Sequence, residues 1–396
     1  MVRRLLVLVS SIVLVDAMLF GALAPLVPGY ADEFELGKGG AGLLVGAFGA
    51  GALAGGIPGG LAAARLGPKR AVVIGLVLLA LASFAFALAA GPWTLGLARF
   101  VQGFSSTTTW AGALAWLTVE TPRSRRGELL GVAFGAAVFG AIVGPMFGAV
   151  ADAISVRAMF GAVGAIALAL AAWAASRAAA VAEASTPGAT RRALRDPRFL
   201  GGLWLNTLPA LLFGLLVVLV PLRLDTGGYG ALAIGLVFFA AGLLETAVNP
   251  LLGRFSDRRG RLLPIRAALA ASVCVAVAFA IVRDPVLVML LTGLAAVAFG
   301  GFYTPGMALV SDRAESVGLA QGLGFGLMNT AWALGNMTGP SAGGAIAGAT
   351  DDAVPYLLAA ALCLLTLVAS FRLRLLAESA PGPSSRPADA SSSARR

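Results

Sequence analysis

Histidine is absent from this chain, and only two cysteines, Cys274 and Cys363, occur among its 396 residues. Two isolated thiols without ligand spacing give neither a disulfide framework nor a metal site. Without imidazole, carboxylates are the side chains left to carry protons near neutral pH. The sequence also lacks the GxxxxGK(S/T) motif of ATP-driven proteins, and we expect no cofactor.

Charged residues are scarce as well. They make up 12% of the sequence, whereas hydrophobic residues make up 59% and the mean hydropathy is +0.90. Apolar runs of the roughly 20 residues needed to cross a bilayer recur at 5–29, 39–63, 71–90, 93–118, 129–152, 157–176, 199–222, 231–253, 263–282, 285–311, 319–348 and 353–373. These runs predict an all-α polytopic membrane protein with twelve transmembrane helices.

The charge that remains is mostly basic, with a net charge of +10. When the loops are assigned alternately to two sides, 24 of the 29 Lys and Arg residues fall on one side. The other side holds only Lys38, Arg157, Arg223 and Arg283, and Arg99 lies within a span. This asymmetry follows the positive-inside rule. It predicts a multi-pass protein with both termini in the cytoplasm, and it removes the reason to expect a nucleic-acid partner. The 27 Arg against 2 Lys residues, together with the lack of organellar signals, favour the inner membrane of a bacterial cell.

The sequence repeats itself at an offset of 193 to 195 residues. FGALAPLVP at Phe20 is matched by FGLLVVLVP at Phe213, GLAAARLGPKR at Gly60 by GRFSDRRGR at Gly253, and GAIVGPMFGA at Gly140 by GNMTGPSAGG at Gly335. The repeat predicts two pseudo-symmetric six-helix halves, 1–176 and 199–374, with a cytoplasmic linker (177–198) and a disordered cytoplasmic tail (375–396). Paired halves with a site at their interface are typical of secondary transporters.

Two Gly-Pro elements interrupt the apolar spans. Gly335, Gly339 and Gly343 recur every four residues and line one helix face, and Pro340 adds a bend. Because small residues let membrane helices approach closely, we expect both copies to form a tight contact between the halves that acts as a conformational gate. The gate residues are Gly140, Gly144, Pro145, Gly148, Gly335, Gly339, Pro340, Gly343 and Gly344. The alternative is ordinary glycine packing.

Three ionisable residues lie inside the spans. A charge near the bilayer centre costs at least about 2.5–3.5 kcal/mol, so Asp16, Arg99 and Glu245 indicate function. We expect the two carboxylates to carry protons and Arg99, which stays charged, to tune them. The alternatives are a buried Asp16–Arg99 ion pair without proton transfer and a Glu245 that faces lipid headgroups near a helix end.

Polar and aromatic residues within the spans are candidates for a substrate cavity. Gln102 shares a helix face with Arg99, and Asn249 follows Glu245 by one turn. The cavity candidates are Gln102, Trp110, Asn206, Tyr303, Asn329 and Trp332. For the aromatic members, contact with lipid or core packing is the alternative.

Together these motifs resemble the major facilitator superfamily, specifically its twelve-span drug:proton antiporter branch. Residues 253–261 resemble the loop signature of that family, residues 99–103 the span-four signature, and the two Gly-Pro elements the span-five antiporter signature, with Ala149 in place of the last glycine in the first copy. Residues 15–28, 98–112 and 339–347 look like vesicular amine transporters. That likeness implies that Asp16 meets a cationic amine, and it places Gly300 and Asn329 where acidic residues are expected.

The resemblance implies a cytoplasmic latch made of Gly60, Arg65, Gly67, Gly253, Asp257, Arg258, Gly260 and Arg261, with Ala64 where the pattern has Asp. It also implies a monomer that exports a small drug-like or amine-like molecule in exchange for protons across the lipid bilayer. Two other functions stay open. One is a facilitator or symporter for a sugar or other metabolite, and the other is a membrane sensor or assembly protein that transports nothing.

Overall fold

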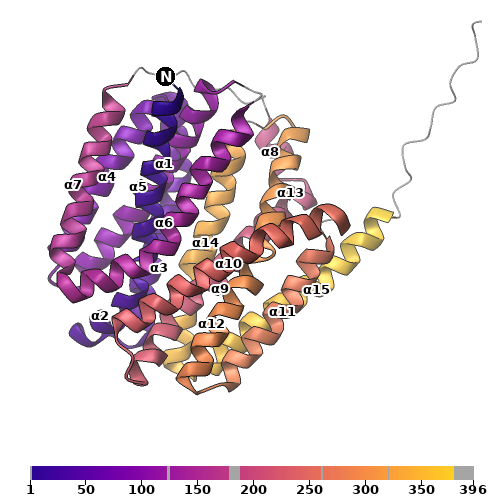
Figure 1. Ribbon diagram of the computed structural model, residues 1–396. Coiled ribbons are helices and arrows are strands. Elements are labelled where there is room, and N and C mark those ends of the chain that lie inside the picture. The colour runs from indigo at the N-terminus through magenta and orange to yellow at the C-terminus, as the bar shows by residue number, and fades with distance from the viewer. Residues whose placement is uncertain (1, 123–124, 178–187, 260–261, 320, 379–396) are drawn as a thin grey trace, which may run out of the picture.

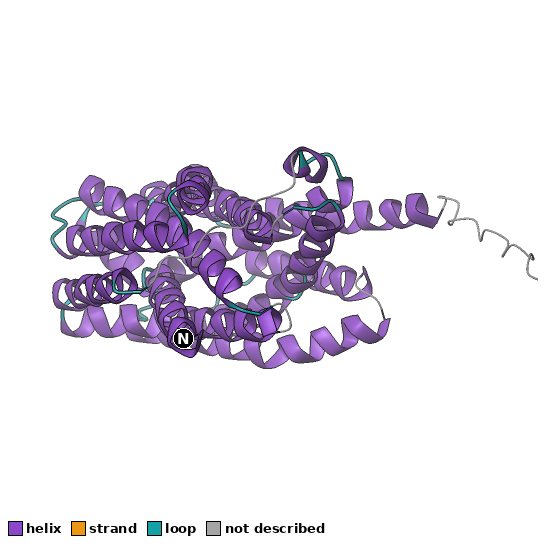
Figure 2. Cartoon of the chain, turned by 90° about the horizontal axis from the view of Figure 1, so that it is seen from above, coloured by secondary structure: helices purple, strands orange, loops and turns teal. Residues whose placement is uncertain are grey.

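The structure is a computed structural model that describes residues 2–122, 125–177, 188–259, 262–319 and 321–378. Over these residues the chain forms helices joined by short turns, and none of them lies in a strand (Figure 2). The predicted all-α fold is confirmed.

The helices of the first half begin with a broken span, α1 (Val2–Gly21), η1 (Ala24–Leu26) and α2 (Val27–Glu33). They continue with α3 (Lys38–Arg65), α4 (Pro68–Ala87), α5 (Pro92–Glu120), α6 (Arg126–Ile154) and α7 (Val156–Ala175). After the short α8 (Ala189–Ala193) come α9 (Pro197–Thr226), α10 (Ala231–Arg259), α11 (Leu262–Ile281), the broken pair α12 (Pro285–Gly300) and α13 (Tyr303–Ser316), α14 (Gln321–Ala349) and α15 (Ala353–Glu378).

Twelve spans follow from these helices. Ten stretches of the described residues are helical, long and apolar enough to cross a membrane. The other two predicted spans are α5 and α14, each 29 residues long. They are less apolar because α5 carries Arg99, Gln102 and the Ser/Thr run 105–109, and α14 is rich in glycine. These are the two helices from which a polar site between the halves would be built.

The helices gather into two groups, α1–α7 and α9–α15, that lie side by side (Figure 1). Between the groups, α3 packs against α14 and α6 packs against α10. We call the side that carries Val2, Arg65 and α8 the inner side, and the side that carries Lys38 and Asp352 the outer side. The inner side corresponds to the predicted cytoplasmic face.

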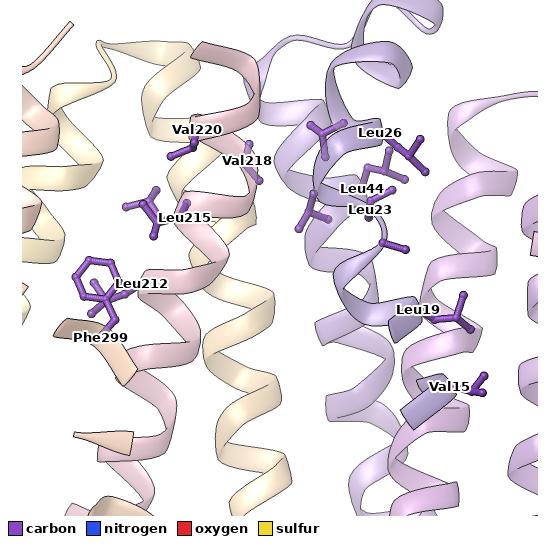
Figure 3. Packing of buried hydrophobic residues seen from close by; sticks show 14 of the residues in the cluster. Val15, Leu19, Leu23, Leu26, Leu44, Leu212, Leu215, Val218, Val220 and Phe299 are labelled. Carbon is purple, nitrogen blue, oxygen red and sulfur yellow. The ribbon is translucent and has the colours of Figure 1, made fainter. Parts of the chain in front are cut away.

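Buried apolar side chains of the first helix in each group contribute to one continuous core. Figure 3 shows Val15, Leu19, Leu23 and Leu26 from the first span beside Leu212, Leu215, Val218 and Val220 of α9. A second, smaller cluster lies on the inner side, where Ala189 and Ala193 of α8 pack with Phe199, Val310 and Ala314. Part of the predicted linker is therefore a helical turn anchored on the second group of helices, and residues 178–187 lie outside the described part.

Positions related by the sequence repeat make related contacts. A Cβ atom built on Gly21 would lie 3.1 Å from Pro145 Cδ of α6, and one built on Gly214 would lie 2.5 Å from Pro340 Cδ of α14. Likewise, Gly42 of α3 meets the Pro340 backbone, and Gly235 of α10 meets the Pro145 backbone. The predicted pseudo-symmetry thus extends to individual helix contacts.

The expectation that the glycine stripes form the contact between the halves is wrong. Gly140, Gly144 and Gly148 face backbone atoms of Leu14, Met18 and Ala22 in the first span, and Gly335, Gly339 and Gly343 face Thr207, Leu211 and Leu215 of α9. The stripes therefore fasten α6 and α14 within their own groups. A period of four defines a helix face, but it does not say which helix that face meets.

Other glycines make the contact between the groups. Gly42, Gly46 and Gly49 of α3 lie against residues 336–344 of α14, including Gly344 of the predicted gate, which faces Gly42 and Lys38. On the other flank, Gly235 lies against Pro145 and Ala149. The two prolines and Gly344 are thus the members of the predicted gate that touch the opposite group.

A matched pair of substitutions tests the stripe on α6. Gly140→Ala would drive a methyl group into the Leu14 backbone, and overpacking of this kind costs about 1–3 kcal/mol. Gly135, on the same helix, has no atom within 4 Å of its built Cβ. We expect a lower melting temperature in detergent for Gly140→Ala and an unchanged or higher one for Gly135→Ala. Equal melting temperatures would show that the stripe is not a packing face.

Candidate functional site

The Asp16 carboxylate lies at the middle of the first span and is buried, with 4% of the residue exposed. Its Oδ2 atom accepts hydrogen bonds from Ser106 Oγ and from Trp110 Nε1, both at 2.7 Å. Ser106 and Trp110 are four residues apart on α5 and so share one face of that helix. Within the described part of the chain, Oδ1 accepts no hydrogen bond. Two donors therefore fix one oxygen, while the other is buried without a donor among the described residues.

Arg99 lies on α5 and is 1% exposed. Its Nη1 donates to the Leu19 carbonyl at 3.2 Å and to Gln102 Oε1 at 3.0 Å. The guanidinium carbon stands 4.8 Å from the centre of the Phe48 ring, a cation–π geometry. Arg99 Nε and Gln102 Nε2 find no acceptor among the described residues.

The alternative of a buried Asp16–Arg99 ion pair is wrong. The ion pairs formed by the described residues, at a limit of 4.0 Å, do not include this one. Asp16 is instead bound by neutral donors and Arg99 by neutral acceptors. Both charges are thus buried without direct neutralisation, which is costly in an apolar interior and leaves each able to respond to a charged ligand.

An aromatic cluster joins this site to the opposite group of helices. Trp332 of α14 contacts Phe20 of the first span edge-on at 5.1 Å between ring centres and lies 6.5 Å from Phe48 of α3. Phe20 and Phe48 are 5.3 Å apart. Because Phe48 also lies under Arg99, residues of α1, α3, α5 and α14 form one continuous site between the groups.

A small cavity of about 30 Å³ adjoins the cluster. Arg99 and Phe20 line it from the first group, and Asn336, Gly214 and Val217 line it from the second. Asn336 is 3% exposed, and its Oδ1 has no donor among the described residues. A volume of this size admits a water molecule, whereas an organic ligand needs a few hundred Å³. In this conformation the interface beside Arg99 is closed to an organic substrate.

Glu245 belongs to a second polar group. It is the central residue of α10, and its Oε1, Cδ and Cγ atoms are the nearest neighbours of a Cβ atom built on Gly300 at the end of α12. Asn249 hydrogen-bonds the carboxylate, and Tyr303 lies within its electrostatic reach. The alternative that Glu245 faces headgroups near a helix end is therefore wrong.

Two other candidates contribute less. Asn206 of α9 is 1% exposed and donates from Nδ2 to the Gly202 carbonyl at 2.9 Å, and its Oδ1 is unpartnered within the described residues. Asn329 of α14 is partly exposed. The structure thus brings Asp16, Arg99, Gln102, Trp110 and Trp332 together and sets Glu245 with Tyr303.

Sequence reasoning left four residues of this site out of its candidate list. Ser106 lies two turns after Arg99 on the same face of α5, so its position on that face was a usable signal. Phe20 and Asn336 lie inside repeated motifs, and that repetition was a second usable signal. Phe48 is one of many apolar residues in a span and carried no distinguishing signal.

The latch residues of the first half lie on the inner side. Gly67, between α3 and α4, has a φ of 90°, which is a backbone conformation that favours glycine. Glycine is therefore needed at this position for the path of the backbone. Arg65 is exposed, and Lys69 Nζ donates to the Arg177 carbonyl at the end of α7. In the second copy, the surroundings of Gly253, Asp257 and Arg258, and all of Gly260 and Arg261, lie outside what the structure describes.

Comparison with known families assigns the fold. Residues 9–325 match the model of the Major Facilitator Superfamily. The chain belongs to this superfamily. It is therefore a membrane transporter and not an enzyme.

Solved structures agree with this superfamily assignment. A bacterial homologue of the human lysosomal transporter Spinster, in inward-facing unoccupied and occupied conformations, superposes with a TM-score of 0.73 at 15% identity, over 95% of this chain and 96% of that chain. A mutant of the nucleoside transporter NupG matches with a TM-score of 0.73 at 15% identity, over 93% and 99% of the two chains. No curated protein matches in sequence. At this identity the structural matches support the fold alone.

An ion pair joins the two halves of this superfamily member on the outer side, and a second pair within the second half supports it. Asp352 accepts from Lys38 Nζ of α3 at 2.6 Å and from Arg223 Nη2 of α9 at 3.2 Å. Arg223 also donates to the Phe279 and Val282 carbonyls at 3.1 and 3.0 Å. We call Lys38, Arg223 and Asp352 the outer clasp. The Lys38–Asp352 pair links α3 to the loop after α14, so it must break if the outer side is to open.

A neighbouring pair supplies a control for the clasp. Asp351 contacts Arg283 at 3.0 Å, both side chains are more than half exposed, and both belong to the second half. The Ala353 backbone N–H and the Arg283 guanidinium lower the pKa of Asp351. This carboxyl group therefore stays charged as the pH falls toward its ordinary pKa, so the pair persists in mildly acidic medium.

Asp352→Asn is expected to favour the outward-open conformation. Weakening the partly buried clasp by about 1 kcal/mol would change the conformational populations about fivefold. A cysteine at Val45, which lines the cavity beside Arg99, should then react several-fold faster with a membrane-impermeant maleimide added from the outer side. Asp351→Asn should leave the rate unchanged. Equal rates in both variants would mean that the clasp does not hold the outer side closed.

Proposed function

We propose that this protein is a monomeric transporter of a bacterial inner membrane that exports a small amine-like organic molecule in exchange for protons. The inner side is the cytoplasmic face in this proposal, and both termini lie there. The observation that carries the proposal is the Asp16 carboxylate, which is buried at mid-span and held at Oδ2 by two neutral donors, with no donor to Oδ1 among the residues described.

A buried carboxylate without a counter-ion can be neutralised by a proton or by an organic cation. The two ligands then compete for Asp16, so release of one accompanies binding of the other. Aromatic faces attract organic cations, and Trp110 lies directly on the carboxylate. Phe20, Phe48 and Trp332 provide further aromatic surface at the interface between the halves.

Arg99 would set the balance of this competition. Its charge shares the interior with Asp16 but is separated from it by the hydrogen bonds to Leu19 and Gln102. The positive charge of Arg99 repels a cation bound at Asp16, so it lowers the affinity for that cation and favours its release. Glu245 would provide a second carboxylate for proton binding in the other half.

Alternating access would follow from rocking of the halves about this site. The outer clasp and the α3–α14 contact hold the outer side closed. Opening that side would break Lys38–Asp352 and close the inner side, where Arg65 of the predicted latch lies. The prolines of the Gly-Pro elements contact the opposite half, so their contacts would change when the halves rock.

One observation favours the second candidate, a facilitator or symporter for a neutral metabolite. Arg99 Nε and Gln102 Nε2 have no acceptor in the part of the chain that the structure describes, and donors of this kind suit the oxygen atoms of a sugar or nucleoside. That NupG is a nucleoside transporter is a property of NupG, and it does not decide between the two candidates here.

Flux measurements separate the candidates. Purified protein is reconstituted in proteoliposomes, and a pH gradient is imposed across their membrane. The flux of four labelled solutes is then measured: tetraphenylphosphonium, an aromatic amine, a nucleoside and a sugar. Under the proposal, the cations move against the proton gradient and the neutral solutes do not. Movement of the neutral solutes with or without the gradient supports the second candidate. No flux of any solute would support a sensor or assembly protein.

A further inference from the structure

The Glu245 side chain crosses from its own helix to a neighbouring one. Glu245 is the midpoint of α10, and its carboxylate lies over Gly300, the last residue of α12. The three atoms closest to a Cβ built on Gly300 all belong to Glu245, with Cγ at 3.1 Å and Cδ at 2.7 Å. The carboxylate therefore occupies the space that any side chain at position 300 would fill.

This close approach differs in kind from those of the packing glycines. At Gly140 and Gly339 a Cβ would meet backbone atoms of another helix, which cannot move without separating the helices. At Gly300 it would meet the end of a flexible side chain, which can rotate away. Gly300 is thus required for the position of a carboxylate and not for the approach of two backbones.

The location is suited to binding a ligand. The helix is interrupted between Gly300 and Tyr303, so α12 and α13 meet beside the carboxylate, and interrupted helices line the sites of many transporters. Asn249 of α10 hydrogen-bonds Glu245, and Tyr303 of α13 is the titratable group close enough to interact electrostatically with it. No charged group on the described parts of the helices packed against α10 acts on this carboxylate.

We propose that Gly300 is a positioning residue that admits the Glu245 carboxylate to the break between α12 and α13, where Glu245, Asn249 and Tyr303 form a second site for a proton or an ammonium group. This inference rests on the proposed function and adds to it a site in the second half. The site depends on where the carboxylate lies and not on which helix supplies it.

The first test needs no substrate because the proton is the probe. Infrared spectroscopy of the purified full chain follows the C=O band of protonated carboxyl groups across pH, and Glu245→Gln identifies the Glu245 component. In Gly300→Ala we expect the midpoint of that component to shift by about one pH unit or more. The control is Gly293→Ala on the same helix, where the new methyl group would make an ordinary 3.5 Å contact with Leu244; its titration should match the native one. A native titration in Gly300→Ala would overturn the proposal.

Transport of tetraphenylphosphonium under a pH gradient gives the second readout. Displacing a reacting group by about 1 Å costs up to a hundredfold in rate, so Gly300→Ala should lower proton-driven flux by about tenfold. Its melting temperature should stay the same or rise, because alanine is a better helix former than glycine. A lower melting temperature together with lower flux would mean that Gly300 serves packing, and would count against the proposal.

Relocation of the carboxylate is the decisive variant. Glu245→Ala should lose proton-driven flux, and Gly300→Asp introduced into that background should restore part of it by returning an acid to the same volume from α12. Failure of this rescue, with the double variant folded, would contradict the proposal. If native protein drives no proton-coupled flux, the proposed function fails; if it does and Gly300→Ala equals Gly293→Ala, only this inference fails.

Discussion

Asp16→Asn is expected to abolish proton-driven transport and leave the protein folded. Asparagine has nearly the same shape as aspartate and still offers an oxygen to Ser106 and Trp110, so the two 2.7 Å contacts can persist. It cannot exchange a proton or neutralise an ammonium group. Loss of a proton-transferring group costs about 10²–10⁴ in rate, and we expect at least the lower figure for gradient-driven flux in proteoliposomes.

Trp110→Phe is the matched control for Asp16→Asn. It removes one hydrogen-bond donor from Oδ2 but keeps the carboxylate and an aromatic ring beside it. A hydrogen bond to a charged group contributes about 1.5–3 kcal/mol, so flux should fall while the dependence on the pH gradient remains. If Asp16→Asn transported as well as Trp110→Phe, and responded to the gradient, Asp16 would not be the coupling residue.

Arg99→Met is expected to separate stability from transport. The buried guanidinium has no ion-pair partner within 4.0 Å among the described residues. Removing it relieves a desolvation penalty of several kcal/mol, which offsets the loss of its hydrogen bonds to Leu19 and Gln102. Methionine also keeps contact with the Phe48 ring. The melting temperature should therefore stay the same or rise. Proton-driven flux should fall by at least about tenfold, because 1.4 kcal/mol of lost electrostatic tuning is a tenfold change.

Arg99→Lys completes this comparison. Lysine keeps the charge but lacks the planar fork of the guanidinium, so it cannot donate to Leu19 and Gln102 in the same geometry. Flux in this variant should lie between those of the native protein and Arg99→Met. A large drop in melting temperature for Arg99→Met, with flux reduced only in proportion to folded protein, would assign Arg99 to structure alone.

The sequence predicted the spans well because membrane helices follow from long apolar runs. The runs that contain α5 and α14 were found in the same way, although these two helices are richer in polar residues or glycine. The breaks at residues 22–23 and 301–302 were not foreseen. Each is nevertheless followed by a proline, Pro25 or Pro305, whose ring would clash with the carbonyl four residues earlier, at Gly21 or Gly301. The sequence therefore carried a signal for both breaks.

The candidate site was predicted in part. Asp16, Arg99 and Glu245 were recognisable because charge inside the bilayer is costly. Gln102 and Asn249 were recognisable as neighbours on the same helix face, but partners on other helices were not. An Asp16–Arg99 ion pair is a reasonable expectation for opposite charges, yet Ser106, Trp110 and Gln102 take the available positions. The glycine stripes were assigned to the wrong neighbours because periodicity identifies a face and not its partner. Gly300 stood where an acid was expected, and the acid comes from Glu245 on another helix.

The central claim is that the two halves alternate between outward-open and outward-closed conformations under the control of Asp16. It is tested most directly by spin labels at the exposed Glu33 and Thr226, at the outer ends of the first span and α9, with Cys274 and Cys363 replaced by alanine. Pulsed dipolar spectroscopy should give two inter-label distances whose populations change with pH in the native background and do not change in Asp16→Asn. One distance that is the same at every pH and in both backgrounds would contradict the account.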